Sequence, residues 1–172
     1  PGSDLWLLHL GVEDGGRFEY KLAVDHGGHE DWVLDPRNPA RASDPFGENS
    51  VCSTYGYQQP AWTVPQGAPS GHLEPLTIES ETFGEARHEH LYVPADHDPA
   101  EPHPLVVIHD GQDFVHYANL AVTLDNLIAA GDIPPLVAAL VHTRDRTGEY
   151  TGGRQHARYV AQELLPAIEA RA

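Results

Sequence analysis

The chain has 172 residues, with 10 Lys+Arg against 26 Asp+Glu, so its formal net charge at pH 7 is −16. That length accommodates one ordinary domain or two small ones. Phosphate groups are bound by clustered cations, so the acidic balance excludes nucleic acid and anionic membrane surfaces as expected partners. No apolar run approaches the roughly 20 residues that a transmembrane helix needs. Cys52 is the single cysteine, which excludes an internal disulfide, and we expect a reducing, cytoplasmic location.

The first part of the chain, residues 1–68, carries the pattern of an antiparallel β module followed by a linker. Apolar and polar residues alternate over residues 18–24, as in a half-buried strand. Glycines in residues 26–29 allow a hairpin reversal into a strand at residues 32–34, which the following prolines end. We expect another strand at residues 6–10, and many turn formers in the remainder.

The second part, residues 69–172, shows a different order of elements: two paired strands, and then strand, helix, strand and helix. A strand–helix–strand unit of this length forms a right-handed crossover, so we expect its two strands to be parallel neighbours in an α/β fold. The predicted strands are residues 76–78, 87–93, 105–109 and 136–141. The predicted helices are residues 116–130, with Gly131 as C-cap, and residues from 151 onward, where Pro166 is expected to kink the last turns.

Residues 105–109 are the best candidate for a strand that carries a site. The strand opens with four apolar residues and a polar turn follows it, which is typical of a strand buried on both faces of a parallel sheet. In such sheets, sites are built at the carboxyl ends of strands. Gly111 lets the backbone turn sharply there, and it can leave the next amide, that of Gln112, pointing into open space. We therefore interpret residues 109–112 as the edge of an active site.

Two segments of the first part resemble a known module. Residues 20–25 have the pattern aromatic-Lys-x-x-Val-Asp, and residues 32–39 end in Asp-Pro-x-Asn-Pro. Together they look like the immunoglobulin-like (early-set, carbohydrate-binding-module-like) β-sandwich that precedes certain glycan enzymes and siderophore esterases. That module has further strands before the position of Trp6, so the resemblance implies that the chain starts inside a domain. We expect Trp6 and Trp32 to pack in the sandwich core, with stacking on a sugar as the alternative.

The second part carries several short motifs, and their order and spacing along the chain are informative together. They are residues 109–112 (HDGQ), 124–127 (LDNL), 133–135 (IPP), 146–150 (R-x-x-E-Y) and 163–166 (ELLP). In this combination they resemble the esterase D-type branch of the α/β-hydrolases, and within it the enterochelin (siderophore) esterases. The resemblance implies an α/β fold in which residues 69–172 form the N-terminal half of an α/β-hydrolase domain, preceded by part of the β-sandwich module.

The resemblance also implies roles for individual residues. In the family, the backbone amide that follows Asp-Gly helps to form the oxyanion hole, so that role falls on the N–H of Gln112, with Gly111 shaping the turn and Asp110 supporting it. A fixed donor at this place can contribute about 3–4 kcal/mol to acyl transfer. Arg146 and Glu149 match a charged pair that orders the loop at the edge of the site.

The nucleophile of the family is absent from the sequence. It is a serine in Gly-x-Ser-x-Gly, and the serines here, at positions 3, 43, 50, 53, 70 and 80, all lack that pattern. The resemblance therefore implies that the Ser/Asp/His triad lies beyond Ala172, that the sequence is an internal piece of a larger hydrolase, and that this chain alone is inactive. Gly153 and His156 stand where the family often has asparagine and an aromatic residue, which leaves the substrate preference open.

Other features can be interpreted as sites. The chain has 12 histidines, but a metal site needs three or four converging ligands, so we expect surface histidines and no metal. Cys52 has no nucleophile signature around it, and the glycines of residues 152–154 more often form a loop than an anion site. The histidines considered as ligands are His88 and His90 on one strand face, and His97, His103 and His109 nearby in sequence.

We therefore expect a segment of a serine esterase that hydrolyses carboxylic esters without a cofactor. The resemblance implies a small-molecule substrate, namely a catecholate siderophore ester, including its ferric form. The first alternative is a polysaccharide-associated feruloyl or acetyl esterase. The alternative from another class is a non-catalytic binding module or a degenerate hydrolase scaffold. The sequence leaves the oligomeric state open.

Overall fold

The computed structural model describes residues 9–151 and 153–171. Contacts divide the chain into two compact units, Pro1–Gln59 and Pro60–Ala172, each of which is considered by itself. The division lies earlier than the expected 68/69 boundary because residues after Pro60 pack on the second unit. There the side-chain amide of Asn126 donates to the carbonyl oxygens of Trp62 and Val64 at 3.0 and 2.8 Å. None of the helices in the described ranges has the length and apolar character to cross a membrane.

The first unit is built from antiparallel strands, as expected, in two small sheets. The predicted strand at residues 18–24 is two strands, because the chain leaves the first sheet at Lys21. Of the predicted strand at residues 6–10, only His9 and Leu10 are described, and neither is in a strand. The three-stranded sheet, in the order β1-β5-β4, holds β1 (Arg17–Tyr20), β4 (Arg41–Asp44) and β5 (Gly47–Ser53), and the second sheet pairs β2 (Leu22–Asp25) with β3 (Glu30–Val33).

The Asp-Pro-x-Asn-Pro segment has a structural role in this unit. Asp35 accepts a hydrogen bond from the Tyr20 hydroxyl at 2.7 Å, and Asn38 donates to the Val51 carbonyl at 2.6 Å. The segment is therefore held against the three-stranded sheet, through β1 and β5. The expectation for Trp32 is wrong: its side chain is 71% exposed, with its indole N–H donating to Glu30, so it does not pack in a core.

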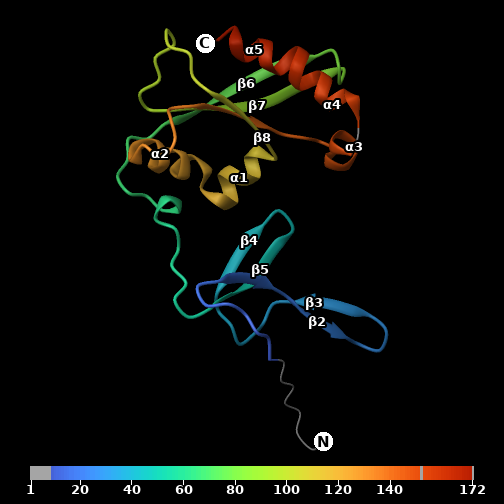
Figure 1. Ribbon diagram of the computed structural model, residues 1–172. Helices are drawn as coiled ribbons and strands as arrows, with labels where there is room; N and C mark the ends of the chain where they lie inside the picture. Colours follow the sequence, from blue (N-terminus) through green and yellow to red (C-terminus); the bar gives the residue numbers. More distant parts are fainter. Residues whose placement is uncertain (1–8, 152, 172) are drawn as a thin grey trace, which may run out of the picture. The chain divides into compact units, whose positions relative to one another are not determined.

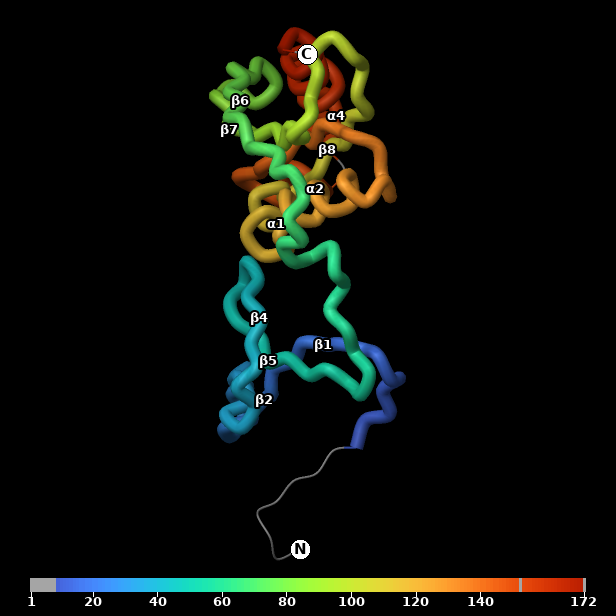
Figure 2. The backbone as a smooth tube through the Cα atoms, turned by 90° about the vertical axis from the view of Figure 1, so that its left-hand side faces the viewer, coloured from blue at the N-terminus to red at the C-terminus, as the bar shows by residue number. Residues whose placement is uncertain are grey.

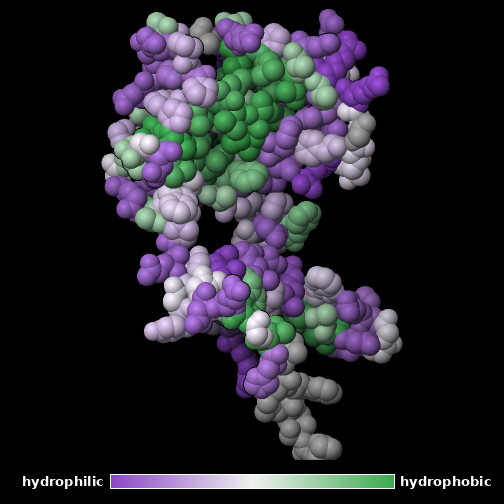
Figure 3. Space-filling view, viewed as in Figure 1, coloured by the Kyte–Doolittle hydropathy of each residue, from purple (hydrophilic) through white to green (hydrophobic). Residues whose placement is uncertain are grey.

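The second unit contains a four-stranded mixed sheet in the order β6-β7-β9-β8. Its strands are β6 (His72–Ser80), β7 (Glu85–Val93), β8 (Leu105–His109) and β9 (Val137–Val141). The strands β8 and β9 are parallel, which confirms the predicted crossover. The expected burial of β8 on both faces is wrong: β8 lies at the edge and Val106 is 41% exposed, whereas β9 is the central, buried strand. Figure 3 shows apolar surface gathered on this unit.

Helices cover both faces of this sheet, as Figures 1 and 2 show. Side chains alternate along β9, so Ala138 and Leu140 pack toward one helical layer and Ala139 and Val141 toward the other. The first layer is α1 (Gly111–Ala118) and α2 (Leu120–Ala130), and the second is α4 (Arg154–Tyr159) and α5 (Leu165–Glu169), joined by a π-turn at Val160–Leu164. The short helix α3 (Arg146–Tyr150) follows β9.

Two helices differ from expectation in their boundaries. The predicted helix 116–130 begins earlier, at Gly111, and breaks at Asn119, which adopts a left-handed conformation with φ of 50°. Gly131 caps α2 with φ of 76°, as predicted. Pro166 has no N–H to donate to the preceding turn, and the irregularity expected there is the π-turn that comes just before it.

Gly111, the first residue of α1, lies close against Leu140, the next-to-last residue of β9. A Cβ at this position would lie 2.5 Å from the Cβ and 2.6 Å from the Cα of Leu140. We expect Gly111→Ala to lower the free energy of unfolding by about 1–3 kcal/mol, the usual cost of overpacking. Chemical denaturation measures this, with Gly153→Ala as control, because a Cβ there meets its nearest atom at an ordinary 3.7 Å. An unfolding free energy that Gly111→Ala leaves unchanged would contradict the close packing.

Candidate active site

The predicted site edge is a strand-to-helix turn between β8 and α1. Asp110 adopts the left-handed conformation in this turn, with φ of 54° and ψ of 34°. The sharp turn therefore occurs at Asp110 and not at Gly111, whose role is the close approach to Leu140. This arrangement places the amide of Gln112 at the start of a helix and at the carboxyl end of the sheet, where a negative charge is stabilised.

The Gln112 amide is not directed into open space. It donates to Nδ1 of His142, which follows the last residue of β9, at 3.3 Å. Nε2 of His142 lies 3.3 Å from Nδ1 of His90, on β7. Burial, then the neighbouring His90, lowers the pKa of His142, so its imidazole is neutral at neutral pH. The sequence interpretation missed His142, although a polar residue just after the neighbouring parallel strand is a signal for a site.

Asp110 is held from both sides of the turn. Its carboxylate accepts a hydrogen bond from Nε of Arg146 at 2.8 Å, and its backbone N–H donates to the hydroxyl of Tyr150 at 3.3 Å. The hydrogen bond to Asp110 raises the pKa of Arg146 above its ordinary value. Thus α3, which supplies both residues, is attached to the site edge.

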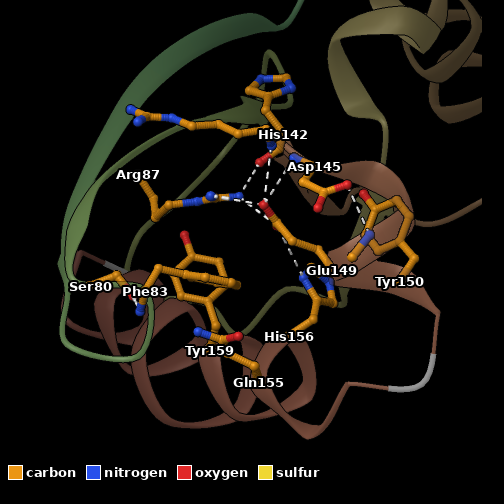
Figure 4. A network of polar contacts seen from close by, with 12 residues as sticks. Ser80, Phe83, Arg87, His142, Asp145, Glu149, Tyr150, Gln155, His156 and Tyr159 are labelled. Carbon is orange, nitrogen blue, oxygen red and sulfur yellow. Dashed lines mark hydrogen bonds and ion pairs between the residues drawn. The ribbon is translucent and has the colours of Figure 1, made fainter.

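Glu149 accepts hydrogen bonds from backbone N–H groups of the loop after β9, and it is paired with a buried cation, Arg87 (Figure 4). Arg87 is 3% exposed and donates to both carboxylate oxygens of Glu149, at 2.8 and 3.2 Å, and to the carbonyl of His142 at 2.7 Å. Burial lowers the pKa of Arg87, but Glu149 outweighs that effect and the pKa is raised. The expected pairing of Arg146 with Glu149 is therefore wrong, because each has a different partner.

Glu89 is a second buried charge that the sequence interpretation did not select. It is 1% exposed and accepts hydrogen bonds from the backbone N–H of His142 at 2.7 Å and from the hydroxyl of Tyr159 at 2.8 Å. Burial raises the pKa of Glu89 above its ordinary value. A signal existed in the sequence, because the alternation along residues 87–93 places Glu89 on the same strand face as Leu91 and Val93.

A second pair of histidines lies on the other side of the turn. Nε2 of His156, on α4, is 3.3 Å from Nδ1 of His109, the last residue of β8, and the ring of Tyr150 packs against both. Burial, then the neighbouring His109, lowers the pKa of His156, which is 9% exposed. His156, at a position of departure from the family pattern, is thus part of the site wall.

The described residues contain no group of three or more His, Cys, Asp or Glu side chains arranged to hold a metal ion. His88 contacts Thr77, and His97 stacks on His103, so the histidines considered as ligands do not converge. Cys52 is a free cysteine on β5 of the first unit. The proposed anion site at residues 152–154 includes Gly152, which lies outside the described residues.

Comparison with known proteins identifies a family for this chain. The family model "Esterase", described as "Putative esterase", matches residues 80–172, more than half of the chain. A search of curated proteins found no match.

Solved structures resemble the chain in fold. The enterobactin esterase from Shigella flexneri, solved in the presence of enterobactin, has a TM-score of 0.65 at 24% identity, over 82% of this chain and 37% of that one. The ferric enterobactin esterase from Salmonella typhimurium has a TM-score of 0.66 at 24% identity, over 81% of this chain and 36% of that one. A ferulic acid esterase from Anaeromyces mucronatus has a TM-score of 0.56 at 16% identity, over 65% and 48%.

The chain thus spans little more than a third of the length of the enterobactin esterases whose fold it shares. The family match covers β7 and every later element of the second unit, including the turn at residues 109–112. On these grounds the chain belongs to the esterase family and has the α/β fold of the enterobactin esterases.

Proposed function

We propose that this chain forms part of a serine esterase that hydrolyses carboxylic esters through an acyl-enzyme. The observation that carries the proposal is the amide of Gln112, which the turn at Asp110 and the close packing of Gly111 fix at the carboxyl end of the sheet. Acyl transfer places negative charge on the carbonyl oxygen, and a preorganised N–H at that point lowers the barrier. The reaction needs neither a metal nor a cofactor.

The nucleophile in this proposal comes from outside residues 1–172. No serine here has the Gly-x-Ser-x-Gly pattern. Two of the buried serines have structural hydrogen bonds: Ser50 accepts from the Asp35 N–H, and Ser80 donates to Glu163. We therefore propose that the 172-residue chain alone does not hydrolyse esters, and that it contributes the oxyanion hole and one wall of the site to the complete enzyme.

The proposed substrate is a catecholate siderophore ester, including its ferric form. Support comes from the extent of the structural likeness, which covers 82% of the chain for the Shigella flexneri enzyme, solved with enterobactin and with 2,3-dihydroxy-N-benzoyl-serine, but 65% for the ferulic acid esterase. The first unit is thus included in the likeness to the siderophore enzymes. We propose a cytoplasmic location, which the free Cys52 fits.

Feruloyl or acetyl esterase activity is the alternative, since a ferulic acid esterase shares the fold. We would compare kcat/KM of the complete protein for enterobactin and for methyl ferulate, following the released acids by chromatography. The proposal expects enterobactin to be preferred by at least tenfold. A preference for methyl ferulate would support the alternative, and hydrolysis of neither ester would favour a degenerate scaffold.

The role of the Gln112 amide can be tested by removing its N–H. Proline is tolerated in the first turn of a helix, so Gln112→Pro deletes the donor while α1 is retained. We expect kcat of the complete enzyme to fall about 10²–10³-fold, the usual effect of losing one oxyanion donor. Gln112→Ala keeps the N–H and is the matched control, with kcat expected within about threefold of the parent enzyme. Equal kcat values for the two variants would exclude the amide from the oxyanion hole.

Glu149 and Arg146 are proposed to support the site in different ways. Glu149→Ala leaves the buried guanidinium of Arg87 without its main partner, and we expect an unfolding free energy lower by about 3–5 kcal/mol. Arg146→Ala removes an exposed ion pair, so the stability is expected to change little. Denaturant unfolding of both variants measures the difference. Similar losses of stability in both would contradict the assignment of Glu149 as the buried support.

A further inference from the structure

We propose that the side chain of His142 is a second donor of the oxyanion hole, acting beside the N–H of Gln112. The inference rests on the proposed esterase function and adds a catalytic side chain to it. Oxyanion holes use two or more donors that converge on one oxygen, and His142 is the polar side chain that the structure brings against the Gln112 amide.

The spacing of the two groups suits one shared oxygen. Nδ1 of His142 and the nitrogen of Gln112 are 3.3 Å apart. An oxygen to one side of the line that joins them, at about 2.9 Å from each nitrogen, the ordinary hydrogen-bond length, can accept from both once both N–H groups are directed at it. The two nitrogens come from adjacent parallel strands, because Gln112 follows β8 and His142 follows β9, so the position is set by the sheet itself.

The hydrogen bonds assign the resting tautomer of His142. Its Nδ1 accepts from the Gln112 N–H, so the ring proton is on Nε2, which donates to Nδ1 of His90. In this tautomer, Nδ1 accepts the hydrogen bond of the Gln112 N–H, as the carbonyl oxygen of a substrate would. The empty oxyanion hole is therefore closed by an internal acceptor.

Substrate binding reverses this chain of hydrogen bonds. Nε2 of His142 passes its proton to Nδ1 of His90, Nε2 of His90 releases one proton to water, and Nδ1 of His142 takes one proton from water. The number of protons on the two rings is unchanged. His142 Nδ1–H and the Gln112 N–H now repel each other, and both turn toward the carbonyl oxygen that binds beside them.

The groups around His142 hold it in place and keep it neutral. Its backbone N–H is fixed by Glu89 and its carbonyl by Arg87. The charged and titratable groups that face the ring are His90 and Arg87 on β7 and Asp113 on α1. Positioning of this kind keeps the ring beside the Gln112 amide while its protons are rearranged, so the donor is in place before charge develops on the oxygen.

The test uses the complete protein and 4-nitrophenyl acetate, a small ester whose hydrolysis depends little on substrate-specific contacts. His142→Leu removes the donor and is expected to reduce kcat about 10²-fold, with KM within about threefold. His142→Asn places an amide N–H close to the position of Nδ1 and is expected to restore most of kcat. The control is His72→Leu, which replaces an exposed histidine on β6 and is expected to leave kcat unchanged.

The possible results distinguish the proposed esterase function from the proposed role of His142. An inactive parent enzyme would overturn the proposed function. An active parent with unchanged or raised kcat in His142→Leu would overturn the role of His142 alone, since the ring would then be only an obstacle to substrate. Loss of kcat in His142→Leu without recovery in His142→Asn would also count against donation from Nδ1.

A second measurement avoids the variants and any loss of folding. The ¹⁵N chemical shifts of His142 in the parent enzyme report which ring nitrogen carries the proton. We expect the proton on Nε2 in the free enzyme and on Nδ1 when phenylboronic acid forms a tetrahedral adduct with the nucleophile. A proton that stays on Nε2 in an enzyme inhibited by phenylboronic acid would contradict the proposal.

Discussion

One buried cation, Arg87, orders the loop on which the site depends. It lies on β7, yet its guanidinium contacts the carbonyl of His142 after β9 and the carboxylate of Glu149 on α3. Taking a charge out of water costs several kcal/mol unless it is paired and hydrogen-bonded, so these groups must be in place whenever the unit is folded. Glu149 in turn accepts from the backbone N–H groups of Arg144 and Asp145. The buried pair thereby fixes the loop that presents His142 to the Gln112 amide.

The local features of the fold could be predicted from the sequence, and the long-range ones could not. Apolar runs, turn glycines and the crossover rule gave the parallel pair β8 and β9 and the cap at Gly131. An apolar run shows that a strand can be buried, but it does not say which strand is central. For that reason β8 was expected to be buried on both faces, although it lies at the edge of the sheet. The interruption of the helix at Asn119 could not be predicted either, because the helical periodicity of apolar residues continues through that position.

The same limit applies to the site. The turn at residues 109–112 was predicted because its signals are contiguous in the sequence. Arg146 and Glu149 were predicted to lie at the site edge, but the sequence did not indicate their partners, Asp110 and Arg87, which lie 36 and 62 residues away in the chain. Partners at such separations follow from the strand order, which the sequence does not state. Arg87 and Glu89 carried the clearest missed signal, since charges on the apolar face of a strand must find buried partners.

The electrostatics of the site edge are compatible with the formation of negative charge, even though the chain is strongly acidic. Four carboxylates lie around the turn, those of Asp110, Asp113, Glu149 and Glu89, and an oxyanion nearby would be repelled by each of them in its charged form. Asp110 is neutralised by Arg146 and Glu149 by Arg87, while burial raises the pKa of Glu89 and disfavours its charged form. The lowered pKa values of His142 and His156 leave neutral rings on both sides of the turn. Three of the four carboxylates around the turn are therefore paired or disfavoured in their charged form, and the helix terminus favours negative charge at the Gln112 amide.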